Sequence, residues 1–272
     1  MAYTKNELKQ ERRNWWYWQE REAAIQAKLT EKNAYKINTH LKKYYRHSMK
    51  EILGQFEATY NKVFSRILEG KEVTPADLYK LDSYWKMKAQ VHNELQKLGD
   101  KQLDLLTENF IKQYQDIYNS IAWESQSHYS TIDTKTVEQI INSIWCADGK
   151  SWSSRIWTNT ERLQETLDEN LIHCVITGKQ PKELKQLLMK RFDVSFSAAD
   201  SLVRTELAHI QTEAAKQRYI DNGISKVQIW ADPDERRCPI CADLHKKIYL
   251  PDANIPIPAH PRCRCCIIPV VE

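Results

Sequence analysis

Residues 238–241 read CPIC, and residues 260–266 read HPRCRCC. Together the two segments hold five of the seven cysteines in the chain. A C-x2-C pair and a later H-x2-C pair each place two soft ligands within one turn, a spacing typical of tetrahedral zinc sites. Metal binding can fold a segment that has too few apolar residues for its own core. We therefore expect the end of the chain to be a small module that a metal ion orders. The rest of the chain is then expected to position this module.

Zinc is the metal expected at this module. The expected ligands come from the two short motifs: Cys238, Cys241, His260 and Cys263. Three further side chains could replace one of these ligands or support it: Cys265, Cys266 and His245. Four protein ligands leave no open coordination position for a substrate water, so the site is expected to be structural. From spacing alone, a cluster of reduced thiols or a disulfide that ties down the chain end is the alternative.

The composition is that of a globular protein with many amphipathic aromatic side chains. Of 272 residues, 42% are hydrophobic and 28% charged, with nine Trp and thirteen Tyr against five Phe. Cysteines that are odd in number and gathered at one end favour a reducing compartment over a secreted disulfide framework. The chain starts with no signal-like segment, and no run approaches the roughly 20 apolar residues that span a bilayer. We expect no membrane association.

The first seventy residues are expected to form one very long helix, or two with a bend. They contain no proline, and Gly54 is the only glycine before Gly70. Apolar residues recur three, four or seven to eight positions apart, as on a helix packed along one side. Residues 1–70 hold 14 Lys and Arg against 8 Asp and Glu. This basic arm could attract nucleic acid or an acidic partner, or it could simply be a solvated helix face.

Four consecutive aromatic residues, WWYW at positions 15–18, interrupt the arm. Successive side chains point around a helix, so the four cannot share one core face. At least one is expected to contact a partner chain, although a helix end wrapped by its own fold is an equal alternative. The candidates for partner or DNA contact on this arm are Arg12, Arg13, Trp15, Trp16 and Trp18.

Helical patterns continue to residue 223, which predicts a mainly α protein. Thr74 and Pro75 begin a helix expected to end at Gly99, and further helices are expected at 100–121, 134–146, 152–177, 181–192 and 197–222. A polar run at 126–131 is the expected seam. Beyond Gly223, proline-rich turns separate short strands expected at 224–230, 247–250 and 266–271. The expected division is a helical arm of helical hairpins at 1–130, a helical part at 131–223 and an α+β Cys/His module at 224–272.

One helical segment carries polar residues that could take part in chemistry. Glu206, His209 and Glu213 fall on one helix face, and Arg204 lies one turn after Asp200. A His and a Glu four positions apart could bind a metal or relay a proton, but a structural polar face is the more ordinary interpretation. No phosphate-binding glycine loop, Ser-His-Asp pattern or H-E-x-x-H motif occurs. An enzymatic function is therefore not expected.

The ordered motifs of the C-terminal half resemble the phage head morphogenesis family, the Mu F-like minor head proteins of tailed bacteriophages. The resemblance covers about residues 130–270, and the arm is similar to that of minor capsid proteins from phages of Gram-positive bacteria. His245 departs from the small residue usual in the family. The residues that carry the resemblance are Arg155-Ile156-Trp157, Arg204-Thr205-Glu206, Tyr219, Gly223, Trp230, Cys238-x-x-Cys241, Asp243-Leu244 and residues 260–265 (HPRCRC).

The resemblance implies a structural minor capsid protein that supports head assembly and DNA packaging or ejection. It implies a location in the capsid interior of the virion, with assembly in the host cytoplasm. The implied partners are the portal protein, scaffold or major capsid protein and packaged DNA, with copies arranged around the portal. Two alternatives remain: a metal-dependent nuclease using Glu206, His209 and the Cys/His cluster, and a zinc-dependent nucleic-acid-binding protein.

Overall fold

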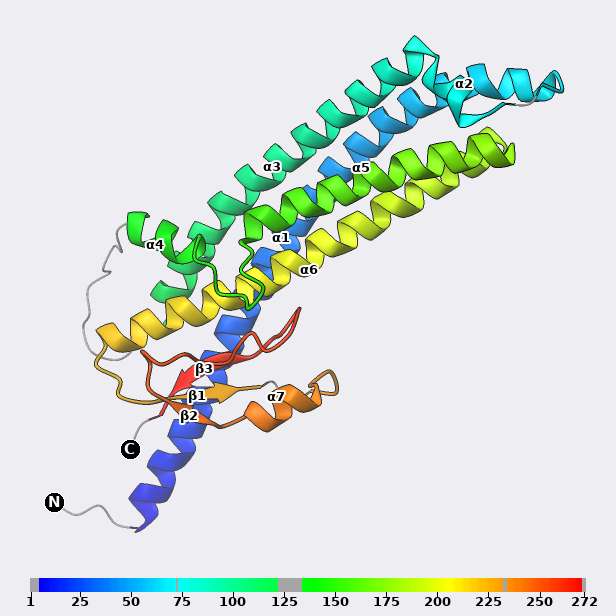
Figure 1. Ribbon diagram of the computed structural model, residues 1–272. Coiled ribbons are helices and arrows are strands. Elements are labelled where there is room, and N and C mark those ends of the chain that lie inside the picture. Colours follow the sequence, from blue (N-terminus) through cyan, green and yellow to red (C-terminus); the bar gives the residue numbers. More distant parts are fainter. Residues whose placement is uncertain (1–4, 72, 122–133, 232–233, 271–272) are drawn as a thin grey trace. The chain divides into compact units, whose positions relative to one another are not determined.

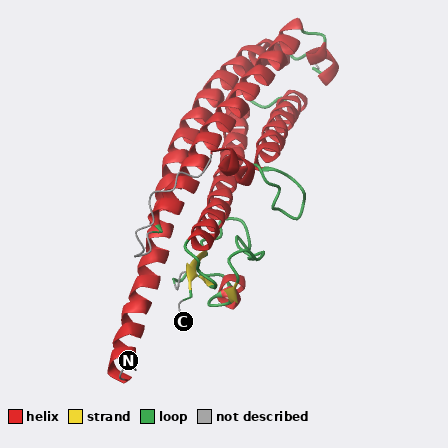
Figure 2. Cartoon of the chain, turned by 90° about the vertical axis from the view of Figure 1, so that its left-hand side faces the viewer, coloured by secondary structure: helices red, strands yellow, loops and turns green. Residues whose placement is uncertain are grey.

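The computed structural model describes residues 5–71, 73–121, 134–231 and 234–270, and side chains from Tyr17 onward. Helices dominate this part, and short strands occur only near the C-terminus, which confirms the expected mainly α fold (Figures 1 and 2). Among the described helices, none is long and apolar enough to span a membrane. The seam expected at residues 126–131 lies outside the described residues. The elements are α1 (Lys5–Leu68), α2 (Pro75–Tyr79), α3 (Asp82–Ser120), α4 (Thr134–Ile141), α5 (Trp152–Thr177), α6 (Pro181–Asp221), β1 (Val227–Trp230), α7 (Pro239–Leu244), β2 (Ile248–Tyr249) and β3 (Cys266–Pro269).

The long helices are more continuous than the sequence pattern suggested. The arm is a single helix of 64 residues, α1, as expected. Helix α6 runs through residues 193–196, where two helices were predicted, because that stretch contains neither proline nor glycine. The helix expected at 134–146 instead stops at Ile141. Just beyond it, Asn142 and Ser143 bond their side chains to helix carbonyls, and such bonds compete with helix extension.

Gly99 was predicted to end a helix, and this prediction is wrong. Helix α3 begins at Asp82 and continues through Gly99 to Ser120, while the helix that starts at Pro75 ends at Tyr79. A Cβ atom at position 99 would lie 2.4 Å from the ring of Trp157 on α5. The glycine therefore permits close packing of α5 on α3, a role that a single sequence does not distinguish from a helix stop.

The chain divides into two compact units that interleave in sequence. Unit 1 comprises Met1–Lys36, Thr107–Ser143 and Ser201–Glu272, and unit 2 comprises Ile37–Leu106 and Ile144–Asp200. Unit 2 is all helical, and apolar side chains from α1, α3, α5 and α6 fill its interior. Its most deeply buried residues include Ile37, Leu41, Ile52, Phe56, Tyr60, Met87, Leu167, Leu171 and Leu188.

Unit 1 combines helix segments with a small antiparallel sheet in the order β2-β1-β3. The register places Trp230 of β1 opposite Cys266 of β3, and both side chains pack in an apolar cluster with Ala23 and Ile268. Figure 1 shows the sheet beside the N-terminal part of α1 and the C-terminal end of α6. The Cys/His segments connect and flank these strands, so the sheet fixes where they lie.

A chain of buried amide and hydroxyl contacts joins the elements of unit 1. Thr30 on α1 bonds Gln211 on α6 at 2.5 Å and accepts a bond from Gln113 on α3 at 2.7 Å. Gln26 donates to the carbonyl of Ile267 on β3 at 3.1 Å, and Gln19 donates to the carbonyl of Pro269 at 3.0 Å. Helix α1 is thus tied to the strand that ends the Cys/His module.

Candidate metal centre

Each of the two short motifs folds into a single turn, as the spacing predicted. Cys238 caps α7, where its Sγ accepts a bond from the Cys241 N–H at 3.3 Å and Pro239 occupies the first turn. In the second motif the Cys263 N–H donates to the His260 carbonyl at 3.1 Å, with Arg262 in the left-handed region at φ 61°. Both turns point their sulfur and nitrogen atoms toward one place.

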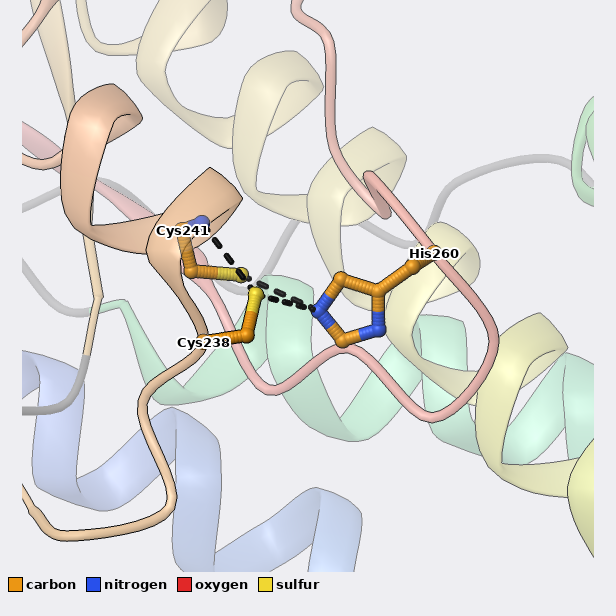
Figure 3. Close-up of side chains that lie close together, drawn as sticks. All are labelled: Cys238, Cys241 and His260. Carbon is orange, nitrogen blue, oxygen red and sulfur yellow. Dashed lines mark hydrogen bonds between the residues drawn. The ribbon is translucent and has the colours of Figure 1, made fainter.

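The sulfur atoms of Cys238 and Cys241 face the His260 ring closely enough to share one ion (Figure 3). His260 Nε2 is 3.2 Å from Cys238 Sγ and 3.2 Å from Cys241 Sγ. Cys241 Sγ is 3.8 Å from Cys263 Sγ. Zinc–sulfur bonds of about 2.3 Å in a tetrahedron put two sulfurs about 3.8 Å apart. Cys238, Cys241 and His260 form one group, and Cys241, Cys263 and Cys265 form a second that shares Cys241, each with ligand atoms within 4.8 Å of one another, so the cluster could hold a metal ion.

His260 has the tautomer that metal binding requires. Its Nδ1 lies 2.8 Å from the Pro261 carbonyl, which can only accept a bond, so Nδ1 carries the proton. The Nε2 lone pair is left facing the sulfurs of Cys238 and Cys241. Metal-binding histidines commonly donate their second ring N–H to such a carbonyl, which holds the ring in orientation.

The thiols of the cluster differ in acidity. The S–H of Cys265, which donates to Cys263, together with nearby backbone groups, lowers the pKa of Cys263 to about 5, while burial opposes the shift. The bond from the Cys241 N–H lowers the pKa of Cys238. Burial raises the pKa of Cys241 to about 12, and the bond to Cys263 together with burial raises the pKa of Cys265. The contact with Cys265 therefore favours the thiolate form of Cys263, the form that binds a metal ion.

The structure gives the three reserve candidates different surroundings. Cys265 forms a group with Cys241 and Cys263 whose sulfurs lie within 4.8 Å of one another. Cys266 lies in β3, buried in the apolar cluster with Trp230. His245 accepts a bond from the Ala231 N–H at 3.2 Å through Nδ1 and packs its ring edge-on against Trp230 at 5.1 Å. Burial lowers the pKa of His245, so it stays neutral and holds the end of β1.

Arginines surround the cluster. A small recess over it is lined by Cys238, Cys241, His260 and Cys265 together with Arg236, Arg237, Arg262 and Arg264. Asp234 binds Arg264 through two contacts of 2.6 and 2.7 Å and also contacts Arg236 at 3.3 Å. The bond to Arg264 holds the pKa of Asp234 well below its usual range. Asp234, which the sequence pattern did not single out, thereby ties the segment before α7 to the second Cys/His turn.

Helix α6 contacts the module through Thr205, which neighbours the polar face expected on this helix. Thr205 Oγ1 accepts a bond from the Arg262 N–H at 3.0 Å, so α6 holds the turn that carries His260 and Cys263. Glu206 and His209 are 3% and 6% exposed, and Arg204 is half-buried. Burial, and secondarily Lys216, lowers the pKa of His209 to about 4, which leaves it neutral.

Glu206 and His209 lie apart from the candidate metal ligands. Among the described residues, the groups that could hold a metal consist of cysteines of the two motifs and His260, and neither Glu206 nor His209 joins them. A nuclease needs its carboxylate and metal open to the substrate phosphate, and Glu206 is buried. Glu206 and His209 are therefore buried polar residues of α6 outside the candidate metal cluster, and a structural role for this face stays a prediction.

Only part of the aromatic run on α1 can be placed. Trp18 is 49% exposed, with Tyr17 packed edge-on against it at 5.7 Å and the Arg21 guanidinium 5.0 Å above its ring. The side chains of Arg12, Arg13, Trp15 and Trp16 lie outside the described residues. Trp18 therefore offers a large amphipathic surface to solvent, of the kind enriched at protein interfaces.

The sequence pattern missed the groups that hold α1 against the module. Glu22 and Gln26 both contact the hydroxyl of Tyr219, whose oxygen also lies 3.2 Å from the Ile267 carbonyl oxygen. The spacing of Gln19, Glu22, Gln26 and Asn33 along one helix face was a usable signal, because it follows the helical period. The apolar stripe of α1 predicts the helix but not these polar contacts.

The fold and the site define a class of protein. Its members are mainly helical chains in which long helices hold a small Cys/His module. Residues 165–268, from α5 to β3, match the family model described as Phage Mu protein F like protein. This segment is therefore similar to that family, in agreement with the resemblance carried by the ordered motifs from Arg204 onward. Proteins of the family are typically structural. No curated protein and no solved structure matches the chain.

Proposed function

We propose that the protein is a minor head protein that associates with the portal inside the procapsid and supports head assembly and DNA packaging or ejection. The observation that carries this proposal is the family match over residues 165–268, a segment that includes both Cys/His turns and their base on α6. Its location is then the capsid interior of the virion, after assembly in the host cytoplasm. The portal, scaffold or major capsid protein are its partners.

In this proposal the N-terminal part of α1 is the docking element. Trp18 presents an exposed ring next to Arg21, and Trp15, Trp16, Arg12 and Arg13 precede it in the same helix. Aromatic and arginine side chains are the residue types that most often dominate binding energy at protein interfaces. The module holds one end of this helix, and the helix presents aromatic and arginine side chains to solvent. This arrangement suits docking at the periphery of the portal ring.

Co-expression with the portal protein of the same phage tests the docking. We expect the two to purify together, and Trp18→Ala to weaken the association by about tenfold or more. Trp85→Ala is the matched control, since Trp85 on α3 is 54% exposed and lies in the other unit. A protein that never purifies with portal, scaffold or major capsid protein would contradict the proposal.

The module in this proposal binds one structural zinc ion through Cys238, Cys241, His260 and Cys263. The facing ligand atoms, the His260 tautomer and the acidic Cys263 support this set. Cys265 supplies an S–H bond to the Cys263 thiolate rather than a fourth ligand. Zinc supplies the cross-link between the two turns, and with four protein ligands no position is open for a reacting water.

Metal content and spectroscopy test this ligand set. The purified protein is expected to carry one zinc per chain, and Cys263→Ser to lose most of it. Cobalt substitution reports the number of thiolate ligands from its charge-transfer band, so Cys265→Ala should keep the three-thiolate spectrum. Less than stoichiometric metal in protein purified without chelator would discard the zinc proposal, and a spectrum changed by Cys265→Ala but not by Cys263→Ser would reassign the fourth ligand.

A further inference from the structure

A row of basic side chains occupies the solvent face of α1 within unit 2. Residues 32–50 contain no Asp or Glu, and the segment 42–50 reads KKYYRHSMK. Lys42, Lys43, Arg46 and Lys50 are all exposed. Within the described part of the chain, the ion pairs are made by other cations and involve none of these four. We call these four residues the basic row.

The basic row is set by the helix period. Lys42, Arg46 and Lys50 are four residues apart, so they lie on one face at a rise of about 6 Å from one to the next. Lys43 lies beside them, three residues before Arg46. On the opposite face Leu41, Tyr45, Ser48 and Ile52 are buried in unit 2. Packing therefore fixes the helix so that the four cations face outward.

Like charges at this spacing oppose helix formation, which requires an explanation. Pairs such as Lys42 with Arg46 and Arg46 with Lys50 repel each other across one helical turn. The exposed faces of the neighbouring helices are different in kind: α3 and α5 alternate acidic and basic residues, as in the pairs Lys88 with Asp168 and Lys97 with Glu94. A helix face that carries only positive charge, at a cost in stability, indicates a negatively charged partner.

We propose that the basic row binds the phosphate backbone of double-stranded DNA without reading its sequence. Phosphates present a dense line of negative charge, which lysine and arginine side chains neutralise by releasing condensed counterions. The row offers flexible cations at regular steps but no Asn or Gln side chain placed to read base edges. This proposal rests on the proposed head function only in naming packaged DNA as the natural ligand.

The salt dependence of DNA binding tests the proposal. We expect the full-length protein to bind 30-base-pair duplexes of unrelated sequence equally. A variant with Lys42, Lys43, Arg46 and Lys50 all changed to Gln should lose about 3 to 4 from the slope of log affinity against log salt, from about 0.9 per phosphate contact. The corresponding loss of affinity near 50 mM salt is roughly a hundredfold or more.

A control variant removes the same charge elsewhere. Arg66, Lys86, Lys182 and Lys190 are exposed and scattered over α1, α3 and α6, and their change to Gln matches the row variant in composition and net charge. We expect this control variant to keep most of the wild-type slope of log affinity against log salt. Thermal melting should show the row variant to be at least as stable as the wild type, because repulsion is relieved.

Two results would overturn the proposal. One is an equal slope for the row variant and the scattered control, which would mean that net charge rather than the row attracts DNA. The other is normal DNA binding by the row variant together with loss of portal co-purification, which would assign the row to an acidic protein surface. Loss of DNA binding by the row variant, with portal association intact, supports the proposal. Failure of the wild-type protein to associate with the portal would contradict the proposed head function but would not contradict DNA binding by the basic row.

Discussion

Both units contain buried polar side chains that bond across elements, such as Tyr45 and Tyr60 in unit 2, but the Cys/His cluster lies in unit 1. In unit 2, Thr160, Asn170 and Gln102 each bond to a carbonyl one turn earlier in their own helix. In unit 1, Gln26 and Gln211 bond to each other and to groups on other elements. Both units therefore combine an apolar core with polar contacts between elements, and unit 1 adds a ligand cluster. Apolar cores tolerate repacking, whereas a network loses several bonds when one member is changed.

Removal of the metal is expected to give the largest difference in stability between the two units. Structural zinc sites in small modules contribute an apparent 10–16 kcal/mol at pH 7, so a strong chelator should unfold the Cys/His module. Hydrogen exchange should then rise across residues 227–269, while the α5 segment of unit 2 keeps its protection. Cys238→Ser should have the same effect without chelator, and Cys146→Ser, a cysteine outside the cluster, should not. Unchanged exchange in the module after metal removal would show that unit 1 does not depend on the cluster.

Unit 2 is expected to respond to lost volume. Phe56 is fully buried, and Phe56→Ala should reduce the free energy of unfolding by about 3–5 kcal/mol because it leaves a cavity. Leu167→Met, which conserves volume at another fully buried position, should cost less than about 1.5 kcal/mol. Urea unfolding measures both. Equal costs for the two changes would mean that unit 2, like unit 1, depends on particular contacts rather than on filling its core.

The same difference explains what the sequence could predict. The helical character of unit 2 follows a simple period and was predictable, although the helix ends predicted at Gly99 and at residues 193–196 were wrong, and the ligand set Cys238, Cys241, His260 and Cys263 stays a prediction. The contacts of Gln26, Thr205 and Asp234 depend on which elements meet in space, and no local pattern encodes that. Gly99 shows the limit most clearly, since its role depends on Trp157, far away in sequence. The proposed boundaries at residues 130 and 223 stay a prediction.

Unit 1 is expected to show a pH dependence that arises from Glu22. Burial raises the pKa of Glu22 from 4.5 to about 7, although bonds with Tyr219 and Gln26 oppose the shift. The folded state therefore holds a proton that the unfolded state releases more easily. The stability from this proton is complete below about pH 4.5 and is lost as the pH rises through about 7.

Comparison of wild type with Glu22→Gln isolates this contribution. The glutamine keeps an oxygen that accepts the Tyr219 bond but does not titrate, so the variant should gain about 2–3 kcal/mol relative to wild type between pH 5 and pH 8. Urea unfolding at the two pH values gives the difference. Glu31→Gln, at an exposed position of the same helix, is the control and should leave the difference near zero. A constant offset between wild type and Glu22→Gln would mean that Glu22 is ionised throughout.

Alanine substitutions at two helix glycines are expected to give the smallest changes in stability. The two changes should have opposite signs. Gly54 on α1 has open space where a Cβ would be, so Gly54→Ala should stabilise the protein by about 0.5–1 kcal/mol through helix propensity. At Gly99 the Cβ would meet the Trp157 ring at 2.4 Å, and Gly99→Ala should destabilise by about 1–3 kcal/mol because the ring must shift. Thermal melts resolve the two signs in one experiment. A stabilising Gly99→Ala would show that α5 can move away from α3 at little cost, and that even unit 2 is less tightly specified by shape than its apolar core indicates.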